Sequence, residues 1–151
     1  MIEPDLSREW TAFGGASLAL MGAALAAGAR GYARDNVAWH AEWRRAVGAP
    51  EAAPLDADGL IRLYRWIGGL ASSLGLAFVL AASMGRALAP RTGPADARVA
   101  GVSLALLGAG FAAMKVRRGS PHGERGADLA VWLLCALWTA FGLRLYIGAA
   151  R

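Results

Sequence analysis

The chain has 151 residues, of which 56% are hydrophobic and 18% are charged, and its mean hydropathy is +0.38. Soluble domains average about 25% charged residues, so this composition excludes a disordered chain and favours helices packed in lipid. The net charge is +5, but the basic residues flank apolar runs instead of forming a stripe, so no nucleic-acid partner is expected. The single cysteine, Cys135, excludes a disulfide within this sequence and any CxxC metal or redox site.

Prolines divide the sequence into four long stretches, and each stretch contains one apolar run. The runs 11–29 and 66–85 carry no charge and reach the roughly 20 residues that a membrane-spanning helix needs. The runs 99–114 and 129–143 are shorter and need their flanking residues to cross the bilayer. A soluble bundle would require a polar face on each helix, and the first two runs have none. The acidic N-terminal segment lacks the basic region of a signal peptide, so the first run is expected to be a retained helix.

These runs predict an all-α membrane protein, a four-helix transmembrane bundle that forms one domain over residues 1–151. An amphipathic connector over about 34–48 is expected between the first two helices. Asp56 or Asp58 is expected to cap the start of the second helix, and Asp128 the start of the fourth. The four helices are expected at about 8–33, 58–89, 95–117 and 127–150.

The first and third runs resemble each other. Residues 15–27 align with residues 101–113 at an offset of 86, and nine of the thirteen positions are identical. The second and fourth runs align only at a few positions: Ser72 with Thr139, Gly75 with Gly142, and Leu76 with Leu143. A duplication with this period would give two parallel helical hairpins, a 2+2 repeat, because two helices lie within each period. Shared Ala, Leu and Gly composition is the alternative explanation.

Small residues recur at every fourth position in both aligned runs. Such stripes let helix backbones approach closely where lipid supplies no hydrophobic drive for association. We therefore expect helix packing at these positions, although an accident of composition would give the same pattern. The expected packing residues are Gly15, Ala19, Ala23, Gly101, Ala105 and Ala109.

Within the four apolar runs there is no Asp, Glu, His, Asn or Gln, so the sequence carries no signature of a membrane-embedded acid–base or haem site. No cofactor is expected. Two His-x-Glu triplets, His40 with Glu42 and His122 with Glu124, lie in predicted loops. Together they could bind a divalent cation such as zinc, but solvated histidines and surface ion pairs explain them equally well.

The connector contains the densest polar and aromatic stretch. Trp39, Trp43 and Val47 share one helical face, and Arg44 and Arg45 lie away from it. This pattern predicts contact with lipid headgroups or with a protein partner, and an ordinary anchored connector is the simpler interpretation.

The fourth apolar run is followed by the charge that lies deepest by sequence, Arg144. Its side chain either snorkels to the nearer interface or marks a contact with a lipid headgroup or partner.

Basic residues are more frequent in 30–65 and 115–127 than in the segments on the other side. The positive-inside rule therefore places these loops in the cytoplasm and both termini outside. The strong preference for Arg over Lys is typical of a GC-rich bacterial genome, so we expect a multi-pass protein of the bacterial inner membrane.

The sequence favours a non-enzymatic accessory, scaffolding or assembly subunit of a larger membrane complex. Its expected partners are the lipid bilayer and either other membrane-protein subunits or further copies of itself. The second interpretation is a small oligomeric channel or transporter for ions or small solutes, lined by Ser17, Ser72, Ser73, Ser103 and Thr139. The third is a membrane enzyme or ligand-binding protein that uses His40, Glu42, His122 and Glu124.

Overall fold

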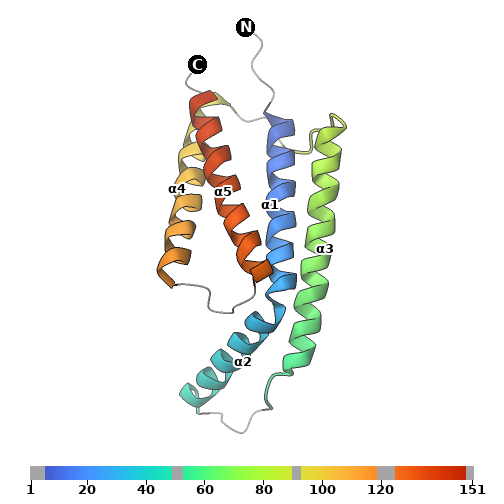
Figure 1. Cartoon of the computed structure of the whole chain (residues 1–151), viewed down its shortest axis with the longest axis vertical. Coiled ribbons are helices and arrows are strands. Elements are labelled where there is room, and N and C mark those ends of the chain that lie inside the picture. Colours follow the sequence, from blue (N-terminus) through green and yellow to red (C-terminus); the bar gives the residue numbers. More distant parts are fainter. Residues whose placement is uncertain (1–5, 49–52, 90–92, 119–124, 149–151) are drawn as a thin grey trace.

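The computed structural model describes residues 6–48, 53–89, 93–118 and 125–148, and these residues form five α-helices (Figure 1). Four of the helices are long and apolar enough to cross a membrane, which confirms the prediction of an all-α transmembrane bundle. The chain is therefore a multi-pass helical membrane protein. The helices are α1 (Ser7–Ala27), α2 (Ala29–Ala46), α3 (Ala57–Ser83), α4 (Pro94–Arg118) and α5 (Arg125–Gly148).

The predicted first helix, 8–33, is divided at Gly28, where α1 ends and α2 begins. The backbone bonds continue through the junction, because the Gly28 N–H donates to Ala24 O and Gly28 O accepts from the Tyr32 N–H. The chain therefore bends at Gly28 with these two hydrogen bonds in place. The expected connector is the helix α2, which begins earlier than position 34.

Glycine also ends α3 earlier than the expected residue 89. Gly85 has a φ of +82°, a backbone conformation that glycine adopts without steric cost. The Gly85 N–H donates to Ala82 O, and the Arg86 N–H donates to Ala81 O at 2.9 Å. This is the Schellman arrangement that closes a helix C-terminus.

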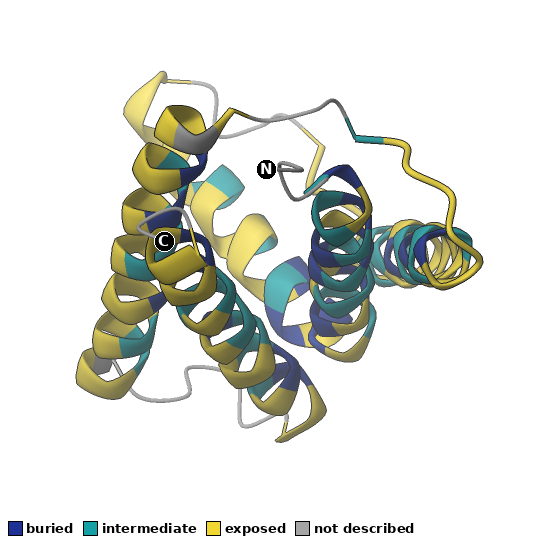
Figure 2. Cartoon of the chain, turned by 90° about the horizontal axis from the view of Figure 1, so that it is seen from above, coloured by how far each residue is buried: buried dark blue, intermediate teal, exposed yellow. Residues whose placement is uncertain are grey.

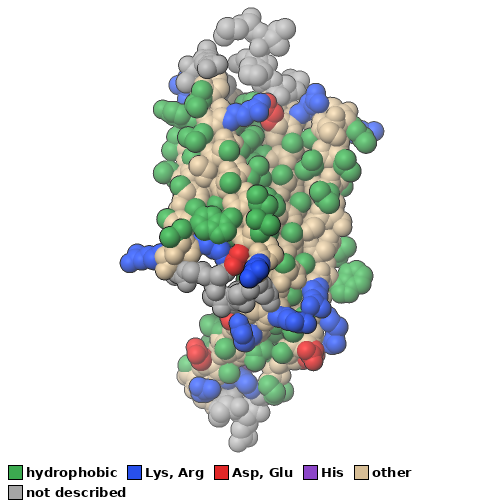
Figure 3. Space-filling view, in the orientation of Figure 1, with side chains coloured by type: hydrophobic (Ala, Val, Ile, Leu, Met, Phe, Trp, Pro, Cys, Tyr) green, Lys and Arg blue, Asp and Glu red, His purple; other side chains and the backbone are tan. Residues whose placement is uncertain are grey.

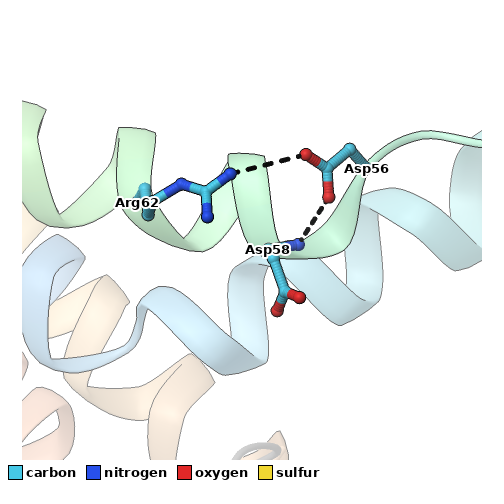
Figure 4. Close-up of polar contacts among 3 residues, drawn as sticks. All are labelled: Asp56, Asp58 and Arg62. Atoms are coloured by element: carbon cyan, nitrogen blue, oxygen red, sulfur yellow. Dashed lines mark hydrogen bonds and ion pairs between the residues drawn. The ribbon is translucent and has the colours of Figure 1, made fainter.

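The start of α3 is held by a side-chain cap. Asp56 accepts a hydrogen bond from the Asp58 N–H at 3.0 Å and lies 3.7 Å from the Arg62 guanidinium (Figure 4). Of the two expected caps, Asp56 is the N-cap residue. Asp128 lies inside α5, where it forms an ion pair with Lys115 at the end of α4. This pair is mostly buried and links the end of α4 to the start of α5.

The four spanning helices form an open row in the order α3, α1, α5, α4 (Figures 1 and 2). Each inner helix contacts two neighbours, whereas the described parts of α3 and α4 do not contact each other. The polypeptide runs in one direction in α1 and α4 and in the opposite direction in α3 and α5 (Figure 1). The row therefore consists of two hairpins of the same orientation, α1–α3 and α4–α5.

Glycines set the distance between the helices of the first hairpin. A Cβ atom built on Gly15 would lie 2.7 Å from Gly75 O and 2.9 Å from Val79 N. A Cβ built on Gly22 would lie 2.5 Å from Gly68 O and 2.6 Å from Ser72 N. Real Cβ atoms do not approach backbone atoms this closely, so α1 and α3 touch backbone to backbone.

The second hairpin repeats these contacts at equivalent positions. A Cβ built on Gly101 would meet Gly142 O at 2.7 Å and Tyr146 N at 2.9 Å. A Cβ built on Gly108 would meet Cys135 O and Thr139 N, both at 2.8 Å. An offset of 86 relates α1 to α4, and an offset of 67 relates α3 to α5. Since the same pairs touch in both hairpins, the sequence repeat is also a structural repeat.

The inner helices α1 and α5 join the two hairpins along their length. The rings of Phe13 and Phe141 stack with centroids 4.2 Å apart, and Trp10 packs edge-on against both. Deeper in the bundle, Trp138 Nε1 donates to Ser17 Oγ at 3.0 Å. Aromatic stacking and side-chain hydrogen bonds thus replace the backbone contact that holds each hairpin.

The connection between α3 and α4 is anchored on α1. Thr11 Oγ1 donates to Ser7 O and accepts from the backbone N–H groups of Leu88 and Ala89. Because Thr11 is buried, these bonds satisfy backbone donors that would otherwise be costly to desolvate.

Charged side chains gather toward the ends of the bundle and leave hydrophobic side chains between them on the face shown in Figure 3. This arrangement matches a bilayer whose apolar interior meets the middle of the four spanning helices. The helix α2 extends beyond the spans at the end opposite the start of α1 (Figure 1).

We predict that Gly15→Ala weakens the first hairpin, because the new methyl group collides with the Gly75 carbonyl and forces two backbones apart. The free energy of unfolding, measured by SDS titration in mixed micelles, should fall by about 1–3 kcal/mol. The neighbouring Gly14→Ala is the matched control, because nothing lies within 4 Å of its Cβ position. Equal stability of the two variants would contradict the backbone contact.

Candidate functional site

The helix α2 is the polar element of the structure and the strongest candidate for a functional surface. It is joined to α1 at Gly28 and packs along the start of α3. The rings of Tyr32 and Tyr64 meet edge-to-face with centroids 6.5 Å apart. Asn36 Nδ2 donates to the Tyr64 hydroxyl at 2.7 Å and to Tyr32 O at 3.1 Å. These contacts give α2 a defined direction relative to the bundle.

One side of α2 presents apolar side chains to the surroundings. Trp39 is 62% exposed, Trp43 is 49% exposed and Val47 is 52% exposed. Large aromatic side chains left this open on a helix outside the spans indicate a contact surface. Arg45 is exposed on another side of the helix, whereas Arg44 is half-buried. We call the exposed side chains of Trp39, Trp43 and Val47 the α2 surface.

The structure tests the predicted cation site only in part. His40 is half-buried with its ring 6.0 Å from that of Trp43, and its Nδ1 atom has no hydrogen-bond partner among the described residues. Glu42 is exposed. The other two expected ligands, His122 and Glu124, lie outside the described residues. Within the described ranges, no group of three His, Cys, Asp or Glu side chains could hold a metal ion.

The expected packing residues divide into two sets. Gly15 and Gly101 are buried at the helix crossings, and Ala19 and Ala105 lie against Gly75 and Gly142. Two others, Ala23 and Ala109, are exposed. A strict four-residue spacing drifts around a helix by about 40° per step, so it leaves the interface after two steps. The contact continues instead through Gly22 and Gly108, which are buried.

The hydroxyl side chains proposed to line a channel are not gathered at one place. Ser17 accepts from Trp138 Nε1, Ser72 donates to Ala19 O, and Thr139 donates to Cys135 O. Ser73 and Ser103 are exposed on different outer helices. Three of the five hydroxyl groups therefore serve the internal packing of the chain.

Arg144 lies at the α1–α5 contact. Its guanidinium is 2.7 Å from a carboxylate oxygen of Glu9, near the end of the bundle where α1 begins. The Arg144 side chain is 69% exposed, so the solvent-screened pair contributes little to stability. The pair gives Arg144 a partner within the chain.

Sequence reasoning did not identify Tyr32, Asn36 and Tyr64 as residues that position α2. Their signal is weak, since single polar residues near the ends of two helices are common in any membrane protein. Lys115 and Asp128 give a clearer sequence signal of their contact, because they are opposite charges at the facing ends of consecutive predicted helices.

Comparisons with known proteins do not identify this chain. No family model, no curated protein and no solved structure matches it.

We predict that Tyr64→Ala loosens α2 from α3, because it removes the ring contact with Tyr32 and the hydrogen bond from Asn36. Each interaction contributes about 1 kcal/mol, so amide hydrogen exchange across α2 should accelerate about thirtyfold in mass-spectrometric measurements. Tyr146→Ala removes a half-exposed tyrosine ring from the opposite end of the bundle, on α5, and should leave α2 exchange unchanged. If Tyr64→Ala also leaves it unchanged, Tyr64 does not hold the helix.

Proposed function

We propose that the protein is a non-enzymatic accessory, scaffolding or assembly subunit of a larger membrane complex, and that the α2 surface docks another subunit. The α2 surface carries the proposal. It places two tryptophans, a residue type that dominates binding energy at interfaces, on a helix held in one orientation. Since α2 extends beyond the spans, this surface faces a protein domain or the membrane boundary (Figure 1).

The residues of α2 indicate what kind of partner would bind it. The helix carries four arginines against two acidic residues, so its own charge is positive. A complementary partner would offer an apolar groove for Trp39 and Trp43 with an acidic rim for the arginines. Such a partner buries the tryptophans more completely than lipid headgroups would, which is why we favour protein over lipid as the occupant.

We further propose that the protein resides in a bacterial inner membrane with α2 on the cytoplasmic side and both termini outside. The described basic side chains at the α2 end support this orientation: Arg30, Arg34, Arg62, Arg65, Arg117 and Arg125 are exposed there. Fewer exposed arginines occupy the opposite end, and basic residues favour the cytoplasmic side.

The orientation predicts how a single cysteine reacts. In a Cys135→Ala background, Val47→Cys should react with a membrane-impermeant maleimide only after the inner membrane is opened, because α2 faces the cytoplasm. Leu88→Cys, at the opposite end of the bundle and also exposed, should react in intact spheroplasts. The reversed labelling pattern would place α2 outside.

The docking surface predicts the loss of a co-purifying subunit. The protein, expressed at its native level and extracted in mild detergent, should retain a stoichiometric partner that mass spectrometry identifies. Trp39→Ala combined with Trp43→Ala should reduce that partner at least about tenfold, since each buried tryptophan contributes about 2 kcal/mol or more at an interface hot spot. Arg45→Glu should reduce it further if the rim of the partner is acidic.

The matched control is Trp66→Ala, which removes a still more exposed tryptophan (71%) from α3. It should leave the amount of partner unchanged. A protein that emerges alone and monodisperse, or a partner retained equally by the double variant and the control, would overturn the proposal.

A further inference from the structure

The open row of helices has two ends, and both present faces that nothing in the described chain covers. At one end, α4 contacts only α5. At the other, the outer side of α3 is apolar and open, with Leu70 62% exposed and Leu74 51% exposed. The inner helices differ, since α1 and α5 each have neighbours on two sides.

The repeat identifies what the outer face of α4 corresponds to. In α1, Phe13 and Ala24 are buried on the side opposite the Gly15 contact. Their equivalents in α4 are Val99 and Gly110. Val99 is 69% exposed, and a Cβ built on Gly110 would have nothing within 4 Å. The outer face of α4 is therefore equivalent to the face of α1 that contacts α5, and no helix of the described chain covers it.

The outer face of α3 corresponds in the same way to the face of α5 that binds α1. Phe141 of α5, which stacks on Phe13, is equivalent to Leu74 of α3. Leu63, Ile67 and Leu70 continue this face at helical spacing, and all are exposed. The two ends of the row are therefore the two halves of an interface that the chain already forms once, between its own hairpins.

Two of the three residue pairs of the α1–α5 contact have compatible equivalents at the two ends. The apolar pair of Phe13 and Phe141 becomes Val99 and Leu74. The ion pair of Glu9 and Arg144 becomes Ala95 and Ala77, so both charges are absent together. The hydrogen-bonded pair of Ser17 and Trp138 becomes Ser103 and Ala71, which removes the donor to the serine.

One charge falls on the equivalent contact. Trp10, which packs on Phe141, is equivalent to Asp96 of α4. Asp96 lies in the first turn of α4 and is exposed, so its carboxylate would stand at the end of the interface and not in its middle.

We infer that the outer face of α4 in one copy packs on the outer face of α3 in a second copy, in the manner in which α1 packs on α5. The two hairpins share one orientation across the membrane, so the second copy takes the orientation of the first and equivalent residues meet at equal depth. The interface is heterologous, joining different faces, and such interfaces close into rings when the rotation between copies permits. This inference does not depend on the α2 surface.

The second copy is favoured over lipid by the repeat. Lipid would cover any apolar face and predicts no relation between Val99 and Leu74, whereas the repeat assigns them to each other. Lipid tails are as apolar as leucine, so association depends on close fit. The α1–α5 contact supplies the arrangement that the two equivalent faces would adopt.

Disulfide cross-linking in native membranes tests the pairing. Two differently tagged copies are produced together in a Cys135→Ala background, one with Val99→Cys and the other with Leu74→Cys, and oxidised with copper phenanthroline. The pair should form a mixed dimer in several-fold greater yield than Val99→Cys paired with Leu143→Cys. Leu143 is the matched control, because it is equally exposed (50%) and lies near Leu74 in depth by the repeat, but belongs to α5.

A second pair, Ala95→Cys with Ala77→Cys, should be joined by a bismaleimide whose spacer matches the combined reach of a glutamate and an arginine side chain, because the repeat predicts this pair from the Glu9–Arg144 contact. Equal yields for the predicted and control pairs would overturn the inference. Preferential linkage of Val99→Cys to itself would overturn it in favour of a symmetric contact. The number of photobleaching steps of the fluorescently labelled wild-type protein in native membranes reports the number of copies in each assembly. A single step indicates a monomer, and this result would show that lipid covers both faces.

Discussion

Contact between helix backbones at glycines is the constraint on which the rest of the structure depends. A bilayer gives apolar helices no hydrophobic reason to leave lipid for one another, so association needs many close van der Waals contacts. Gly15 against Gly75 and Gly101 against Gly142 provide them, because no side chain separates the two backbones. Each hairpin is therefore tightly packed, and both hairpins are held together by equivalent glycine contacts.

Joining the hairpins uses a different chemistry. Between α1 and α5 the helices are held by stacked rings of Phe13 and Phe141 and by the hydrogen bond from Trp138 to Ser17. Because this contact joins the first helix of one hairpin to the second helix of the other, it leaves an open row with two unpaired faces. The described chain offers surfaces more prominently than clustered reactive groups, and surfaces are what a subunit of an assembly needs.

The bend at Gly28 gives the chain its other surface. A single proline-free stretch becomes a spanning helix and a polar helix, and α2 leaves the bundle with its tryptophans exposed. The Tyr32 ring lies where a Gly28 side chain would be, and it is held there by Tyr64. The same glycine thus bends the chain and makes room for the contact that directs α2, so the α2 surface has a defined position relative to the bundle.

The sequence by itself determined the helical class and the spans, and it indicated the repeat and two candidate caps for α3, Asp56 and Asp58, because hydropathy, length and capping are properties of single segments in their solvent. It did not show that α3 ends at Ser83. Pro90 marked the expected boundary, whereas Gly85 ends the helix before the proline is reached. Only the tertiary structure decided that Gly22 continues the packing stripe while Ala23 faces outward, that Ser17 meets Trp138, and that α3 and α4 stand at the ends of a row. The choice of partner depends on the shapes of two segments far apart in the chain, and the hydropathy of either segment alone carries no record of that fit.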